Sequence, residues 1–131
     1  MNVLGHGIDL VEIARIERML ADHAERFVDR CFDPVEAEYA DGAEAVRCER
    51  LAARFAAKEA VLKALGTGLR SGMEWTDIVM VRDELGAPSI RLGGRVAEVA
   101  ASKGIEAWQL SLSHAGGFAM ASVLALGPAA D

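Results

Sequence analysis

The chain has 131 residues, of which 52% are hydrophobic and 26% are charged, and its formal net charge at pH 7 is −6. This length and hydrophobic content predict a single globular domain over residues 1–131 and exclude an intrinsically disordered chain. General nucleic-acid binding requires a basic surface, so the acidic balance excludes nucleic acid as the expected partner.

Hydrophobic periodicity predicts a strand and two helices in the first third of the chain. Residues 3–10 form an apolar run typical of a buried strand, and residues 11–20 carry apolar side chains at helical spacing. The dipeptide Asp33-Pro34 is a favourable helix start, because an N-cap acid precedes proline at the first helical position. We expect the helix that begins there to end near Gly42.

The strongest helical pattern covers residues 45–65 and is followed by Gly66, a favourable C-cap residue. Lys58 lies close to the centre of its apolar stripe, a position that an amphipathic helix normally gives to an apolar side chain. The stripe itself consists of Leu51, Phe55, Leu62 and Leu65.

The second half of the chain predicts two antiparallel hairpins separated by a short helix. Glycine-containing turns join strands that are rich in apolar residues. The predicted elements are strands 75–82 and 87–92 with turn 83–86, helix 94–102, and strands 107–113 and 118–126 with turn 115–117. A strand, then helices, then antiparallel strands predict an α+β fold, with an antiparallel sheet and a long central helix.

The sequence lacks the features that would indicate export or membrane insertion. No apolar run approaches the roughly 20 residues that cross a bilayer, and Asp9 and Glu12 interrupt the apolar segment that a signal peptide needs. The two cysteines, Cys31 and Cys48, form neither a CxxC pair nor a disulfide framework. We therefore expect a cytoplasmic protein with reduced thiols and no membrane partner.

Three charged residues indicate chemistry on a phosphate. Glu59 and Lys63 are four residues apart on the long predicted helix and share one face. Asp9 lies in an apolar run, where a carboxylate is costly to bury unless it is paired or metal-bound. Two acids that share a hard cation, beside a lysine, are the parts of a magnesium–phosphate site. The alternatives are a solvated Glu59–Lys63 surface bridge and an Asp9 that caps a helix or pairs with a basic residue.

The segment Gly66-Thr67-Gly68 differs from a phosphate-binding loop of the P-loop kind. Such a loop places the anion at a helix N-terminus, whereas these glycines follow a C-terminus with partial negative charge. Any phosphate near this loop must therefore be held by the metal and Lys63. Thr67 and the two glycines could add shape and backbone amides, and Gly66 also serves as the C-cap.

His114 lies at the end of a predicted strand, where it shares one face with Leu110 and Leu112. A single histidine at the end of an apolar face is either structural or a ligand contact, and the sequence leaves both open. The histidines and cysteines show no zinc-ligand spacing.

Four segments together resemble the group I 4′-phosphopantetheinyl transferase family, the holo-acyl-carrier-protein synthases. Their order matches the family's motifs, and they cover nearly the whole chain. His6 departs from the family pattern, since members often carry a small or apolar residue there. The segments are Gly7-Ile-Asp-Leu-Val-Glu-Ile13, Arg54-Phe-Ala-Ala-Lys-Glu-Ala60 with Lys63-Ala-Leu-Gly-Thr-Gly68, Asp83-Glu-Leu-Gly-Ala-Pro88 and Leu110-Ser-Leu-Ser-His-Ala115.

The resemblance implies transfer of the 4′-phosphopantetheine group of coenzyme A to a serine of apo-acyl carrier protein, with release of adenosine 3′,5′-bisphosphate. It implies Asp9 and Glu59 as ligands of Mg²⁺, with Lys63 against the diphosphate. Arg54 and His114 would contact the nucleotide or its 3′-phosphate. The family is typically a homotrimer with sites between subunits. The acceptor could belong to fatty acid biosynthesis or to polyketide synthesis.

Docking of a carrier protein requires a local basic patch, because carrier proteins are acidic and this chain is acidic as well. Arg15 and Arg18 lie three residues apart on the first predicted helix, and with Arg26 they form the expected docking surface. The alternative is that they pair with Glu12 or Asp22 as solvated bridges.

Two other functions would use the same residues. A magnesium-dependent nucleotide hydrolase would use the same acids with water as the nucleophile. A non-catalytic nucleotide-binding module would lose folding or binding, but no transfer activity, when Glu59 is replaced.

Overall fold

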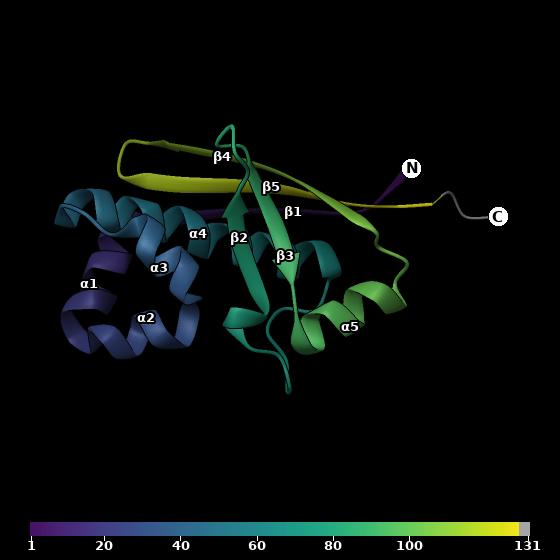
Figure 1. Ribbon diagram of the computed structural model, residues 1–131, viewed down its shortest axis with the longest axis horizontal. Coiled ribbons are helices and arrows are strands. Elements are labelled where there is room, and N and C mark those ends of the chain that lie inside the picture. Colours follow the sequence, from purple (N-terminus) through teal and green to yellow (C-terminus); the bar gives the residue numbers. More distant parts are fainter. Residues whose placement is uncertain (129–131) are drawn as a thin grey trace.

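Two antiparallel sheets and one long helix form the frame of the computed structural model, which describes residues 1–128 (Figure 1). Strand β1 (Asn2–Glu12) precedes helices α1 (Ile13–His23), α2 (Glu25–Cys31), α3 (Pro34–Ala40) and α4 (Glu44–Leu65). A 3₁₀ turn, η1 (Trp75–Asp77), leads into β2 (Ile78–Arg82), β3 (Pro88–Leu92), α5 (Gly94–Ser102), β4 (Ala107–Ala115) and β5 (Phe118–Gly127). This arrangement confirms the predicted α+β fold with a long central helix.

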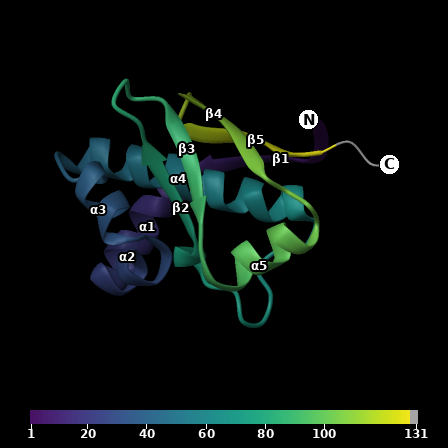
Figure 2. The same ribbon diagram turned by 45° about the vertical axis from the view of Figure 1, so that its right-hand side comes forward.

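Helix α4 lies against one face of the three-stranded sheet, whose strand order is β1-β5-β4. The β2–β3 hairpin crosses the helix, while α1, α2 and α3 group near its first half (Figures 1 and 2). Small side chains make this close packing possible, because they let the helix axis approach the sheet. Ala56, Ala60, Ala119 and Ala121 are all fully buried at this contact.

Two glycines bring β1 into direct contact with the backbone of α4. A Cβ atom at Gly5 would overlap the carbonyl oxygen of Ala64, and one at Gly7 would overlap that of Ala60. No other residue type allows a strand to approach a helix so closely. The contact fixes which side chains of β1 lie beside the second half of α4.

The strand expected over residues 3–10 is present, but the prediction that it is buried is wrong for one of its two faces. Ile8 and Leu10 are 50% and 60% exposed, whereas Gly7 and Val11 on the alternate face are buried. The continuous apolar pattern therefore marks a sheet whose second face is apolar but open in the single chain.

The first helix also begins later than predicted, at Ile13, because Val11 and Glu12 continue the pairing of β1 with β5. Helix α2 was missed in the sequence, since only Ala24, with a positive φ of 47°, separates it from α1. The strand predicted over residues 75–82 begins only at Ile78, because residues 75–77 form a 3₁₀ turn.

Other predicted elements are confirmed. Helix α3 begins at Pro34, where the side chain of Asp33 accepts from the amide of Val35 and forms a capping box with Glu36. Helix α4 ends at Gly66 with a φ of 76°, the left-handed conformation that glycine favours. Among the helices of residues 1–128, none is long and apolar enough to span a membrane. The predicted domain extends to Asp131, and residues 129–131 lie outside the described part.

Candidate active site

Asp9, Glu59 and Lys63 meet where β1 crosses α4. Lys63 Nζ donates to Asp9 Oδ1 at 2.9 Å and to the carbonyl oxygen of Ile8 at 3.0 Å. Lys63 therefore pairs with the acid on β1 and not with Glu59, so the alternative of a Glu59–Lys63 surface bridge is wrong. The alternative that Asp9 pairs with a basic residue is confirmed by the same contact. Asp9 is only 15% exposed in its side chain, whereas Lys63 is 54% exposed.

Glu59 lies close enough to Asp9 for the two charges to interact. Burial raises the pKa of the Glu59 carboxyl above its ordinary value, and the negative charge of Asp9 raises it further. The positive charges of Arg15 and Lys63 act in the opposite direction. The raised pKa of Glu59 beside a second carboxylate is the electrostatic arrangement that a bound cation relieves.

The donor set fits a hard divalent cation such as Mg²⁺ held only in part by protein. Asp9 and Glu59 offer carboxylate oxygens, the ligands that Mg²⁺ prefers, and Mg²⁺ commonly uses one or two carboxylates together with substrate phosphate oxygens. Among residues 1–128, no group of three or more histidine, cysteine and acidic side chains could form an all-protein site. A metal at this position would therefore have to take its remaining ligands from a bound substrate or from water.

The loop after α4 has little capacity to bind a phosphate through its first amides. The amide of Gly66 donates to the carbonyl oxygen of Lys63, and the amide of Thr67 donates to that of Leu62. The Thr67 hydroxyl donates to the carbonyl oxygen of Gly68. The expectation that Gly66 and Thr67 supply free backbone amides is therefore wrong, because helix capping uses both. Gly68 remains a candidate for substrate contact through the shape of the loop.

Arg54 and His114 line one pocket of about 430 Å³, formed by α3, the first half of α4, the β2–β3 hairpin and β4. His114 Nε2 lies 3.0 Å from Glu49 Oε1, and its imidazole is mostly exposed. Arg54 is almost fully buried, and burial lowers its pKa to about 10. The structure thus brings together the two residues that were predicted to contact the nucleotide.

The two groups of predicted site residues lie at opposite edges of the sheet. Asp9 belongs to β1 and His114 to β4, and β5 lies between those strands. On α4, Glu59 and Lys63 lie about 140–180° around the helix from Arg54, at 3.6 residues per turn. One chain therefore presents two separate groups of residues, which we name the acid edge (Asp9, Glu59, Lys63) and the arginine edge (Arg54, His114 and the other residues of their pocket).

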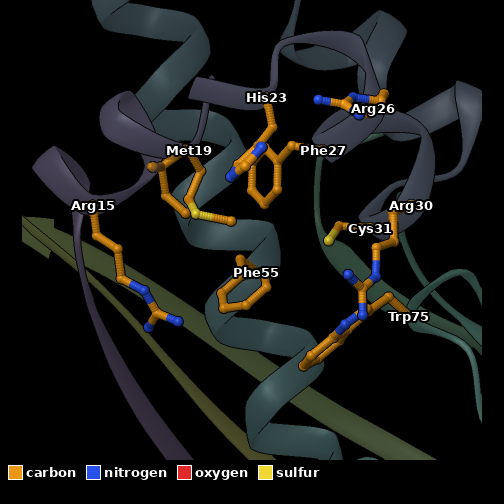
Figure 3. Close-up of a pocket in the computed structure, with 10 residues that line it drawn as sticks. Arg15, Met19, His23, Arg26, Phe27, Arg30, Cys31, Phe55 and Trp75 are labelled. Atoms are coloured by element: carbon orange, nitrogen blue, oxygen red, sulfur yellow. The ribbon is translucent and has the colours of Figure 1, made fainter. Parts of the chain in front are cut away.

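A second pocket, of about 540 Å³, lies between α1, α2, α4 and η1. Figure 3 shows the ring of Phe55 near its centre, with Arg15 on one side and Arg30 and Trp75 on the other. The guanidinium of Arg15 is 5.6 Å from the centroid of the Phe55 ring. An apolar floor surrounded by arginines suits an acidic partner that carries an apolar side chain.

Of the three arginines expected to dock a partner, only two belong to this pocket. Arg15 and Arg26 line it, together with Arg30, which the sequence did not single out. Arg18 lies instead 3.7 Å from Glu12 in an exposed ion pair, as the alternative for that residue predicted.

Sequence reasoning also missed a buried ion pair between α3 and α4. Lys58 and Glu36 are both fully buried, with Lys58 Nζ 2.7 Å from Glu36 Oε1. Lys58 also donates to the carbonyl oxygens of Trp75 and Ile78, and the amide of Met80 donates to Glu36 Oε2 at 3.2 Å. The signal was present as a lysine at the centre of an apolar stripe, but its partner is 22 residues away.

Comparison with known proteins assigns this arrangement to one family. Residues 5–122 match the family model of the 4′-phosphopantetheinyl transferase superfamily. The holo-[acyl-carrier-protein] synthase of Trichlorobacter lovleyi is 47% identical over 96% of this chain and 99% of its own length. That of Anaeromyxobacter dehalogenans is 49% identical over 93% of this chain and 94% of its own length.

Solved structures agree with the sequence comparison. The holo-[acyl-carrier-protein] synthase of Neisseria meningitidis has a TM-score of 0.85 and 32% identity, covering 95% of this chain and 99% of that one. The Helicobacter pylori enzyme in complex with coenzyme A has a TM-score of 0.81 and 32% identity, covering 92% and 99%. The fold, the order of the motifs and these relatives agree: the chain belongs to the 4′-phosphopantetheinyl transferase superfamily, among its holo-acyl-carrier-protein synthases.

Proposed function

We propose that the acid edge carries out the family's reaction, with Asp9, Glu59 and Lys63 as its catalytic groups. The enzyme transfers the 4′-phosphopantetheine group of coenzyme A to a serine of apo-acyl carrier protein and releases adenosine 3′,5′-bisphosphate. The observation that supports this assignment is the contact of Lys63 with Asp9, beside a Glu59 whose pKa is raised. It gathers two carboxylates and one ammonium where a metal-bound diphosphate fits.

Asp9 and Glu59 would hold Mg²⁺, which neutralises the diphosphate when it is bound. Lys63 supplies a compact positive charge for the leaving phosphate, which gains negative charge as its bond to the transferred phosphorus breaks. The serine hydroxyl must lose a proton, which we assign either to Glu59 or to water at the acid edge. Arg54 and His114 bind the nucleotide, and the loop of Gly66, Thr67 and Gly68 shapes the substrate's surroundings.

A complete site requires two subunits in this proposal. The acid edge and the arginine edge of one chain are separated by β5 and by α4, so a neighbouring copy would supply the missing half. The outer face of the sheet offers the surface for that assembly. Exposed apolar side chains of both strands lie there, since Leu10 pairs with Met120, and Ile8 and Phe118 are exposed as well. We propose a homotrimer, in which these faces cover one another.

The carrier protein docks at the pocket of Arg15, Arg26 and Arg30 in this proposal. Its acidic side chains would approach the arginines, and an apolar side chain would enter toward Phe55. This pocket lies close to the acid edge: Arg15, which lines the pocket, is near enough to Glu59 for its charge to lower the pKa of that carboxyl. The acceptor serine would therefore arrive near the catalytic groups. We expect the reaction to take place in the cytoplasm and to serve fatty acid biosynthesis.

The test is the intact mass of an apo-acyl carrier protein after incubation with this enzyme, coenzyme A and Mg²⁺. The expected result is a mass gain equal to one phosphopantetheine group, with one adenosine 3′,5′-bisphosphate released per acceptor. Breakdown of coenzyme A at the same rate without acceptor would favour the nucleotide hydrolase instead. Binding of coenzyme A without either product would favour the non-catalytic module.

A further inference from the structure

Three arginines from two elements gather around the ring of Tyr39, a residue of α3. The guanidinium of Arg54 lies 4.1 Å from the ring centroid, and those of Arg50 and Arg82 each lie 5.1 Å from it. Arg50 and Arg54 belong to α4, whereas Arg82 ends β2. All four residues line the pocket of the arginine edge. Like charges repel at such separations, so an arrangement of this kind needs a compensating feature.

Among residues 1–128, the acids nearest to these arginines form their ion pairs with other residues. Glu36, the buried acid whose charge acts on Arg54, forms its ion pair with Lys58. Glu49 also lines the pocket, but its Oε1 lies against His114. Two of the arginines instead use backbone carbonyl oxygens, since Arg50 donates to that of Tyr39 and Arg82 to that of Gly86.

Arg54 provides a separate sign that the cluster is built for a ligand. It is only 2% exposed, and within residues 1–128 its Nε atom is a buried polar group that makes no hydrogen bond. The guanidinium of Arg54 makes one hydrogen bond within the described residues, a long one of 3.4 Å from Nη1 to the carbonyl oxygen of Arg50. A buried donor without a partner costs free energy, which an acceptor from a bound anion would recover.

We propose that Tyr39 is a positioning residue, whose ring gathers Arg50, Arg54 and Arg82 into one binding site for a phosphate monoester. The face of an aromatic ring attracts cations and so offsets part of their mutual repulsion before the ligand arrives. A phosphate monoester carries close to two negative charges near neutral pH, which suits a cluster of several guanidinium groups.

This inference rests on the proposed function, which identifies the monoester as the 3′-phosphate of coenzyme A. The diphosphate of the same molecule belongs to the acid edge, where the metal and Lys63 would bind it. Tyr39 then sets the preference for coenzyme A over dephospho-coenzyme A, which lacks only the 3′-phosphate. The ring and not the hydroxyl provides this effect, because the arginines contact Tyr39 through its ring and its backbone carbonyl.

The experiment compares binding of adenosine 3′,5′-bisphosphate and adenosine 5′-monophosphate by calorimetry, which requires no transfer activity. Tyr39→Leu should weaken binding of the bisphosphate roughly tenfold, equal to about 1.4 kcal/mol. The affinity for the monophosphate should change by less than about twofold. Tyr39→Phe should bind both nucleotides like the wild type, because it keeps the ring.

A matched pair of arginine variants on the β2–β3 hairpin completes the test. Arg82→Ala should lose affinity for the bisphosphate alone, whereas Arg91→Ala, an exposed arginine of β3 outside the cluster, should not. Equal losses for both nucleotides in Tyr39→Leu, or no loss for either, would overturn the proposal. So would a Tyr39→Phe variant that behaves like Tyr39→Leu. The proposed transferase activity is judged separately by the mass gain of the carrier protein, so each idea can fail without the other.

Discussion

The acid edge and the arginine edge are built with opposite electrostatic deficits. At the acid edge, burial and the charge of Asp9 raise the pKa of Glu59, so the edge lacks positive charge. At the arginine edge, burial and the charges of Arg82 and Arg50 together lower the pKa of Arg54 to about 10, although the charge of Glu36 opposes them, so that edge lacks negative charge. A polyanion bound together with a divalent cation would satisfy both edges. These opposite deficits are why we propose that one polyanionic substrate contacts both edges.

Removal of one acid should break the acid edge completely. Asp9→Ala and Glu59→Ala should each lower kcat by roughly 10³-fold or more, since both would hold the cation that compensates the diphosphate in the proposed mechanism. Thermal melts should stay near wild type, because neither side chain is part of the core. Near-normal transfer by either variant at ordinary Mg²⁺ concentrations would contradict the metal assignment.

Mixing two inactive variants tests whether the edges come from different chains. Glu59→Ala should inactivate the acid edge and His114→Ala the arginine edge, so in mixed oligomers roughly one quarter of the sites should combine two intact halves. Activity should therefore reappear on mixing, and mass spectrometry would confirm that subunits exchanged. If exchange occurs and activity stays absent, both halves must act within one chain.

Lys63→Met should lower kcat by roughly 10²-fold and change the KM for coenzyme A much less, because its charge matters most as the leaving phosphate develops charge. Lys63→Arg should recover only part of the loss, since a forked guanidinium does not replace a compact ammonium. Lys103→Met, at the exposed end of α5, serves as the control for loss of a lysine. Wild-type kcat in Lys63→Met would assign the lysine a purely structural role beside Asp9.

The docking pocket can be tested apart from both edges. Arg26→Glu combined with Arg30→Glu should raise the KM for carrier protein about tenfold, leave that for coenzyme A unchanged and flatten the salt dependence. Arg15 is left intact, because its charge also acts on Glu59. Arg18→Glu is the matched control, since Arg18 lies outside the pocket. If Arg18→Glu raised the KM for carrier protein equally, the docking surface would lie along α1 and not in this pocket.

The smallest expected effect concerns stability against pH. The folded chain raises the pKa of Glu59 above the ordinary 4.5, so ionisation of this group destabilises the metal-free fold. This loss of folding free energy is absent at pH values below the ordinary pKa of 4.5, and it grows as the pH rises through the raised pKa of the folded state. Glu59→Gln should therefore melt slightly above wild type at pH 8 without metal, but not at about pH 4. The exposed Glu84→Gln in the β2–β3 turn should show no such difference.

The sequence predicted the acid edge better than the arginine edge, for reasons of distance along the chain. Glu59 and Lys63 share a helix face, and that local relation can be inferred from spacing alone. The pairing of Lys63 with Asp9 joins residues 54 positions apart, and it depends on how β1 crosses α4. The cluster around Tyr39 joins α3, α4 and β2, so no local pattern announces it.

The open face of β1 was mispredicted for a related reason. An apolar run such as residues 3–10 shows that a strand avoids water, but it does not show whether the cover comes from the same chain. Lys58 shows the reverse case. Its position in an apolar stripe was visible, whereas the acid that makes its burial tolerable came from another helix.

The separation of the two acids depends on a residue that has no functional group. Gly7 lets β1 rest on the carbonyl oxygen of Ala60, the residue next to Glu59, and Asp9 lies two positions further along the same strand. A single added methyl group at Gly7 would lift the strand away from the helix and change the distance that a shared cation must bridge. A search for catalytic positions that replaces only polar side chains would therefore overlook one of the residues on which this site most depends.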